Sequence, residues 1–91
     1  MIVKFYGKFI RICQTKSYNL KLTENKNIKK VIDLIIDEYG KELEEVMYNN
    51  NTVSKKVLIL VNNKNIYHQN GLETMLKNND VVKILPVTAG G

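Results

Sequence analysis

The first part of the chain alternates between hydrophobic and polar positions as β-strands do. Residues 1–7 are rich in β-branched and aromatic side chains, which favours a strand. In Ser17–Leu22 every second residue is hydrophobic, beginning at Tyr18, which predicts a strand buried on one face. Residues 9–13 are ambiguous between a helical turn and irregular structure. The two strands are close enough in sequence to pair as an antiparallel hairpin with a long connection.

The next segment places hydrophobic residues at helical spacing. The positions are Ile28, Val31, Ile32, Ile35 and Tyr39. Because they fall on one side of a 3.6-residue repeat, they predict an amphipathic helix over residues 28–39. Asn27 is a suitable N-cap and Gly40 a suitable left-handed C-cap for this helix. Residues 41–47 predict a short second helix that buries Leu43, Val46 and Met47, and residues 49–52 predict a loop.

Further strands follow, separated by asparagine-rich turns. Val57–Val61 is continuously apolar, as is typical of a central strand covered on both faces. Residues 62–65 predict a turn, because asparagine tolerates positive φ better than most residues. Ile66–His68 then predicts a short returning strand.

The pattern also predicts where the folded domain ends. Residues 71–79 contain Leu72, Met75 and Leu76, which we expect to pack a turn beneath the sheet. A turn at residues 78–80 leads into a last strand at 81–85. Pro86 should end that strand, because proline lacks the N–H that a strand donates. Two strands, a helix and further strands predict a two-layer α+β domain over residues 1–85 and a flexible tail over residues 86–91.

Length and composition restrict the class of protein. A chain of 91 residues supports one domain with a modest core. No apolar run approaches the roughly 20 residues that a bilayer-spanning helix needs. The amino-terminal apolar segment is too short for a signal peptide. We therefore expect a cytoplasmic protein without membrane partners.

The net charge of +5 does not by itself indicate nucleic-acid binding. Nucleic-acid binders concentrate basic residues on one stripe and add stacking aromatics or a recognition motif. Here the lysines are scattered, with Lys29–Lys30 and Lys55–Lys56 as the adjacent pairs. One cysteine, Cys13, excludes an internal disulfide, and the lone His68 has no companion at the spacing of a zinc site. We expect no bound metal or cofactor and no specific nucleic-acid partner.

The last six residues carry the candidate chemistry. They are Pro86, Val87, Thr88, Ala89, Gly90 and Gly91. Extended, they would reach roughly 20 Å, and the terminal glycines would enter a channel too narrow for a Cβ atom. The one reactive group at the tip is the Gly91 carboxylate, which needs activation before sulfur or nitrogen can attack it. A frayed end is the alternative reading, since termini are commonly disordered.

The carboxyl-terminal part of the chain resembles a known family. Leu72-Glu73-Thr74-Met75-Leu76, then Asn79-Asp80, an apolar strand, Pro86 and a Gly-Gly end look like the signature of the MoaD/ThiS sulfur carriers. The resemblance extends over essentially the whole chain and implies a ubiquitin-like β-grasp fold with a mixed sheet packed on one main helix. Asn79 replaces the family's glycine, and we expect it to take the left-handed conformation. A single proline also replaces the common pair.

The resemblance implies a carrier and not an enzyme. An E1-like enzyme of the MoeB/ThiF type would use ATP to adenylate Gly91, and a sulfur donor would convert it to a thiocarboxylate. The tail, Pro86 to Gly91, would then insert into a MoaE-like large subunit that makes molybdopterin. Two alternatives stay open: a modifier joined to lysines through Gly91, which can also supply sulfur for tRNA thiolation, and a non-covalent interaction module.

Several other residues have structural explanations. We expect Cys13 to be a buried thiol and His68 a surface residue. Asp80 sits in a turn, where its carboxylate would accept a backbone hydrogen bond. The aromatic cluster of Phe5, Tyr6 and Phe9 is expected to pack in the core or to form a partner-binding face. The strand lysines Lys4 and Lys83 are expected to be solvated or to contact an acidic partner.

Overall fold

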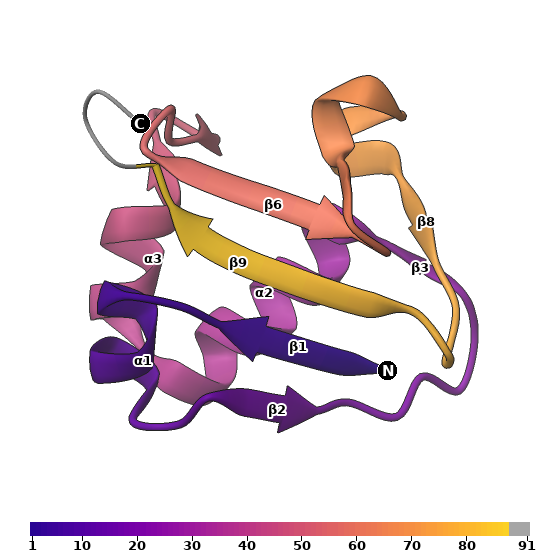
Figure 1. Cartoon of the computed structure of the whole chain (residues 1–91), viewed down its shortest axis with the longest axis horizontal. Helices are drawn as coiled ribbons and strands as arrows, with labels where there is room; N and C mark the ends of the chain where they lie inside the picture. The colour runs from indigo at the N-terminus through magenta and orange to yellow at the C-terminus, as the bar shows by residue number, and fades with distance from the viewer. Residues whose placement is uncertain (88–91) are drawn as a thin grey trace.

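The fold is a five-stranded mixed sheet that curves around helix α2 (Figure 1). The computed structural model describes residues 1–87. The sheet strands are β1 (Ile2–Phe5), β2 (Ser17–Asn19), β6 (Val57–Val61), β7 (Lys64–Asn65) and β9 (Val81–Pro86). The helices are α1 (Lys8–Cys13), α2 (Ile28–Tyr39) and α3 (Lys41–Met47), with 3-10 turns η1 (Ile66–His68) and η2 (Gly71–Glu73). Two small ladders are β3 (Lys26–Asn27) with β8 (Met75–Leu76) and β4 (Tyr48–Asn49) with β5 (Thr52–Val53).

Strand β9 lies at the centre of the sheet, whose order is β2-β1-β9-β6-β7. It pairs in parallel with β1 and antiparallel with β6, while β2 pairs antiparallel with β1. The predicted hairpin of the first two strands is confirmed, although β2 stops at Asn19, before the predicted Leu22. The last strand includes Pro86, one residue beyond the predicted end at Leu85.

Helix α2 forms where the hydrophobic spacing predicted it. The Asn27 side chain accepts a hydrogen bond from the Lys30 N–H at 2.9 Å, and the Gly40 N–H donates to the Ile36 carbonyl at 2.7 Å. The predicted N-cap is therefore present. Gly40 does end the helix at positive φ, but at φ 97° and ψ −169° it is not in the predicted left-handed helical conformation. Helix α3 follows directly, and the ambiguous segment after β1 is helix α1.

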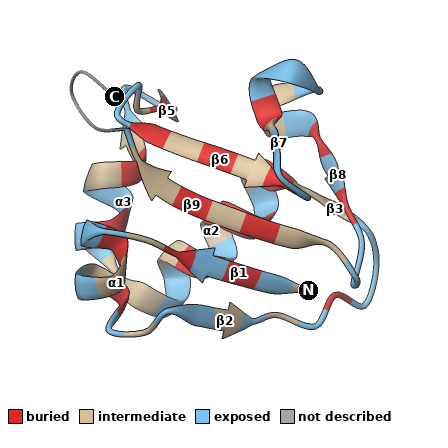
Figure 2. Ribbon diagram, viewed as in Figure 1, coloured by how far each residue is buried: buried red, intermediate tan, exposed pale blue. Residues whose placement is uncertain are grey.

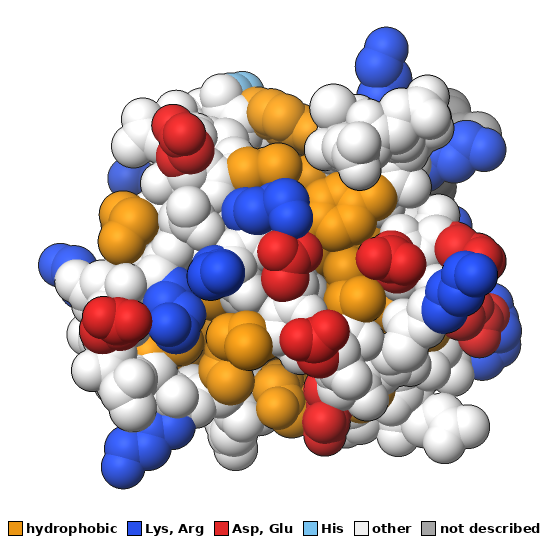
Figure 3. Space-filling view, turned by 180° about the vertical axis from the view of Figure 1, so that it is seen from behind, with side chains coloured by type: hydrophobic (Ala, Val, Ile, Leu, Met, Phe, Trp, Pro, Cys, Tyr) orange, Lys and Arg blue, Asp and Glu red, His pale blue; other side chains and the backbone are white. Residues whose placement is uncertain are grey.

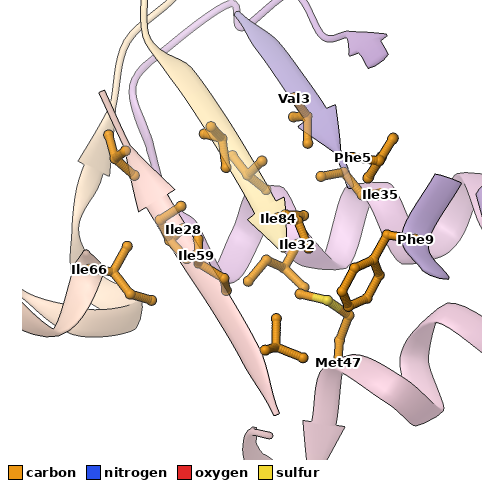
Figure 4. Close-up of a cluster of buried hydrophobic side chains, with 14 of the residues drawn as sticks. Val3, Phe5, Phe9, Ile28, Ile32, Ile35, Met47, Ile59, Ile66 and Ile84 are labelled. Carbon is orange, nitrogen blue, oxygen red and sulfur yellow. The ribbon is translucent and has the colours of Figure 1, made fainter. Parts of the chain in front are cut away.

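The core lies between the concave face of the sheet and the helices. Figure 2 shows buried residues alternating along the strands, as expected for a sheet with one covered face. Figure 4 shows Phe9 and Met47 meeting Ile32 and Ile84 beneath the sheet. The core therefore joins all three helices to β1, β6 and β9.

Three local predictions are wrong. Val57–Val61 alternates between buried and half-buried residues, because only one face of the sheet is covered. Ile66–His68 is a 3-10 turn, since the Asn65 side chain caps the Tyr67 N–H and bends the chain. Met75 is 55% exposed, because its short ladder with β3 turns it outward and buries Leu76 instead.

Two predicted turns differ in detail. Asn62 and Asn63 adopt positive φ in the turn between β6 and β7, as predicted. Asn79 does not, so the expected left-handed conformation there is wrong. The predicted loop at residues 49–52 contains the β4–β5 ladder around a tight turn.

None of the helices within residues 1–87 is long and apolar enough to cross a membrane.

Candidate functional site: the tail root and the open sheet face

The predicted tail begins on the sheet itself. Pro86 is the last residue of β9 and pairs with Val57 of β6. One residue later, the Val87 N–H donates to the Lys56 carbonyl at 2.9 Å, and Val87 is 47% exposed. Thr88, Ala89, Gly90 and Gly91 lie outside the described residues. The sheet therefore fixes the chain through Val87, and we call Gly7, Lys56, Pro86 and Val87 the tail root.

The sequence did not predict two residues of the tail root, Lys56 and Gly7. Gly7 contacts Pro86 most closely. It adopts φ 56° and ψ −131° between β1 and α1. A Cβ atom there would lie 2.8 Å from Cγ of Pro86. Positive φ suits glycine, and the contact leaves no room for any other side chain. The signal in the sequence was the position of a glycine directly after a strand, but its partner is 79 residues away and only the fold reveals it.

The face of the sheet away from the helices is open. Its side chains form rows across the strands, because each register position places neighbours side by side. The row nearest the tail root holds Leu85 and Leu58, and Tyr6 follows β1 beside it, where its N–H donates to the Ile84 carbonyl at 3.1 Å. The middle row holds Lys4, Lys83 and Leu60, and the far row holds Ile2 and Val81. The result is a largely apolar surface with two lysines in the middle.

Charge is divided between the two faces of the molecule. The strands of the five-stranded sheet contain no Asp or Glu. Six of the nine carboxylates of the chain lie instead in α2 and α3. Figure 3 shows this helical side, where acidic side chains stand among lysines around a partly apolar centre. The open sheet face is therefore basic where it is charged.

The residues that resemble the family signature have structural roles. Thr74 is 4% exposed, and its hydroxyl donates to the Gly71 carbonyl at 2.7 Å and accepts from the Asn70 N–H at 3.1 Å. The Asp80 carboxylate accepts from the Lys77 N–H at 2.8 Å, as predicted, and from the Asn62 side chain. The Thr74 contacts close the 3-10 turn η2, and the Asp80 contacts hold the turn from which β9 starts. They therefore shape the strand that carries the tail.

Cys13 and His68 take the positions expected of them. Cys13 is buried in the core, and burial raises the pKa of its thiol from 9.0 to about 11. A buried, protonated thiol is a poor nucleophile. His68 is exposed, on η1 and not on the predicted strand. Of the aromatic cluster, Phe5 and Phe9 are core residues, whereas Tyr6 is half-buried and lies in the open face.

Comparison with known proteins adds family information to this geometry. The model of a family described as the ThiS family matches residues 3–91. A candidate sulfur carrier protein of Archaeoglobus fulgidus is 34% identical over 68 residues, which are 75% of this chain and 77% of that protein.

Solved structures share the fold over nearly the whole chain. Small archaeal modifier protein 1 from Methanosarcina acetivorans is 28% identical with a TM-score of 0.84, over 99% of this chain and 94% of that one. A candidate molybdopterin converting factor subunit 1 from Pyrococcus furiosus is 20% identical with a TM-score of 0.77, over 96% and 95%. The second likeness concerns the fold alone. The predicted ubiquitin-like β-grasp fold is confirmed.

Proposed function

Because this chain belongs to the ThiS family of sulfur carriers, we propose that an E1-like enzyme adenylates its Gly91 carboxylate and that a sulfur donor converts it to a thiocarboxylate. One observation carries the proposal: the family match extends to residue 91, so it includes the Gly90–Gly91 end. Carriers of this family are small proteins and not catalysts, and ATP is the activating partner's substrate. No cofactor bound to this chain is needed, and the cytoplasm is the proposed compartment.

The proposed chemistry takes place at one carbon atom. A carboxylate oxygen of Gly91 attacks the α-phosphorus of ATP, and pyrophosphate leaves. A donor of a hydrosulfide equivalent then attacks the acyl carbon and forms a C–S bond. The bond between the acyl carbon and the phosphate oxygen breaks, and AMP leaves. The thiocarboxylate sulfur is a softer and stronger nucleophile than the original oxygen. A narrow channel in the partner would favour glycine at the end of the chain, because glycine has no Cβ.

The tail root supports this role physically. The partner would receive Pro86, Val87, Thr88, Ala89, Gly90 and Gly91, of which the first two are held by the sheet. A protein that receives the tail must also cover the neighbouring row of Leu85 and Leu58, with Tyr6 beside it. Apolar surface next to a fixed tail is suitable for docking, because burying it stabilises the complex.

We propose a molybdopterin precursor as the final sulfur acceptor, with a MoaE-like large subunit as the partner that holds the tail. The segment after α2 supports this choice over the shorter thiamin type. That segment forms α3 and the β4–β5 ladder. Both elements lie at the end of the molecule from which the tail leaves (Figure 1).

Conjugation to lysines is the second candidate function. The likeness to small archaeal modifier protein 1, at 28% identity over 94% of that chain, favours it. In this reaction a lysine amine would attack the activated acyl carbon, an amide bond would form, and AMP or a thiol would leave. Sulfur supply for tRNA thiolation uses the same activated terminus.

Intact mass spectrometry of protein purified from its native host tests the proposal. We expect a fraction of the chains to gain the mass difference between sulfur and oxygen, located at Gly91. A variant without Gly90–Gly91 is the control and should show no gain. Gly-Gly remnants on lysines of other proteins, without any thiocarboxylate, would favour conjugation. If a host in which the pathway is active contains neither the thiocarboxylate nor the Gly-Gly remnants, both functions are contradicted.

A further inference from the structure

Two lysines lie next to each other in the middle of the open sheet face. Lys4 of β1 and Lys83 of β9 are partners in the parallel register. Val3 and Phe5 are buried on the opposite face, as are Val82 and Ile84, so both lysine side chains project outward. Neighbouring strands lie about 4.8 Å apart. Like charges in adjacent positions destabilise a sheet.

The structure contains no charge that compensates for this pair among residues 1–87. The three ion pairs of that part of the chain involve neither lysine. Lys83 instead donates to the side-chain oxygen of Asn63 at 2.7 Å, in the turn on the side away from Lys4. That amide is neutral, so both positive charges remain. No strand of the sheet carries a carboxylate, so within residues 1–87 no neighbouring strand position supplies a negative charge to the pair.

The surroundings of the pair are those of a protein-docking site. Leu60 continues the row beside Lys83, and apolar rows lie on both sides of it. A hollow beside Lys4 is lined by Phe5, Tyr6, Ile10, Lys16 and Ser17. When a partner covers the apolar residues around a charged contact, water is excluded from that contact. The attraction between opposite charges there becomes stronger.

We propose that Lys4 and Lys83 together receive a carboxylate of the activating enzyme. The inference rests on the proposed function and adds the chemistry by which the partner is recognised. Lys83 is three residues before Pro86, which corresponds to about 10 Å along a strand. An enzyme that holds the tail root therefore also covers the lysine pair. To share one Asp or Glu with Lys4, the Lys83 ammonium group would leave Asn63, and the carboxylate would then offset the repulsion of the pair and set the register of docking.

The pair predicts opposite effects on the isolated protein and on the complex. K4Q or K83Q removes the repulsion, so each variant should melt about 2–4 °C higher than wild type. Each should associate with the activating enzyme about tenfold more slowly at low salt, because steering by charge is lost. Purely structural lysines would not give stabilisation together with weaker binding. K83R keeps the charge and should associate at the wild-type rate.

Stopped-flow association with the E1-like enzyme of the same host, between 0.05 and 0.5 M salt, measures this effect. K64Q is the matched control, because Lys64 lies on edge strand β7 of the same sheet and its loss changes net charge equally. K64Q should lower the rate less than twofold, and the K4Q/K83Q variant should show a weaker salt dependence than wild type.

The outcomes separate this inference from the proposed function. If the double variant associates at the wild-type rate while wild type supports ATP–pyrophosphate exchange, the lysine pair has no such role and the carrier function stands. If wild type supports no exchange, the proposed function itself fails. Binding of a single-stranded oligonucleotide that is lost in K4Q/K83Q, with enzyme binding unchanged, would also overturn the inference.

Discussion

Gly7 and Gly71 both adopt positive φ, at 56° and 57°, but their surroundings differ. A Cβ atom at Gly71 would meet nothing within 4 Å, whereas at Gly7 it would lie 2.8 Å from Pro86. G7A should therefore lower the free energy of unfolding by about 2–4 kcal/mol, of which about 1–2 kcal/mol is backbone strain. G71A should lose only the part of the stability that corresponds to backbone strain, because its Cβ would meet no neighbour. Urea unfolding of both variants measures the difference.

The contact with Pro86 can be tested separately from the strain. Replacing Pro86 by alanine removes the Cγ and Cδ atoms that a Cβ at position 7 would meet. In the G7A/P86A variant we therefore expect the two losses to be less than additive, by about 1 kcal/mol. Strict additivity would show that Gly7 does not hold Pro86 in place.

Cys13 gives the core a predictable response to alkaline pH. Burial raises the pKa of its thiol from 9.0 to about 11, so the folded state holds its proton more tightly than the unfolded state. The stability this provides is complete below pH 9 and is lost as the pH rises toward 11, by about 1–2 kcal/mol once solvent screening is allowed for. C13A lacks this dependence. Urea unfolding at pH 8, 9, 10 and 11 should show wild type losing more stability than C13A.

Single residues were predictable from the sequence where the cause is local. The Asn27 cap and the turn at Asn62 depend on neighbours within three residues. The contact of Gly7 with Pro86 and the adjacency of Lys4 to Lys83 depend on which strands pair, and no local pattern contains that information. The φ of Asn79 also depends on how the turn is held by the rest of the fold. The family's glycine at this position therefore could not predict it.

At the scale of elements, the 3-10 turn η2 depends on one buried hydroxyl. Thr74 bonds to Gly71 and Asn70, so T74V would leave the Asn70 N–H without its partner. We expect T74V to lower the free energy of unfolding by about 1–3 kcal/mol. T74S keeps the hydroxyl and should lose less than about 1 kcal/mol. Equal losses in the two variants, measured by urea unfolding, would assign the effect to packing of the methyl group.

Elements with a long repeat were predicted better than short ones. Helix α2 has five hydrophobic positions in register, and no competing pattern fits them. Ile66–His68 has strand-like composition, but one hydrogen bond from Tyr67 to the Asn65 side chain turns it into η1. Val57–Val61 was correctly predicted as a strand and wrongly as covered on both faces. Continuous hydrophobicity there reflects the half-buried row on the open face as well as the core.

The whole molecule separates its stability from its proposed chemistry. The core ends at Ile84, and the last backbone hydrogen bond of the described chain joins Val87 to Lys56. The reactive carboxylate is four residues further on. The open face lies on the side of the sheet away from the core, so a partner can cover apolar surface and the tail root without entering the core.

A chain that ends at Val87 should therefore fold as the full chain does. We expect its free energy of unfolding to agree within about 0.5 kcal/mol, since surface changes away from packed residues have small effects. It should also bind the activating enzyme through the sheet face, but it should form no acyl-adenylate, because its terminal carboxylate is too close to the sheet to reach the nucleotide. ATP–pyrophosphate exchange and urea unfolding measure the two properties independently. Exchange at the wild-type rate would contradict activation at Gly91, and a loss of more than 1 kcal/mol would show that residues 88–91 contribute to the folded domain.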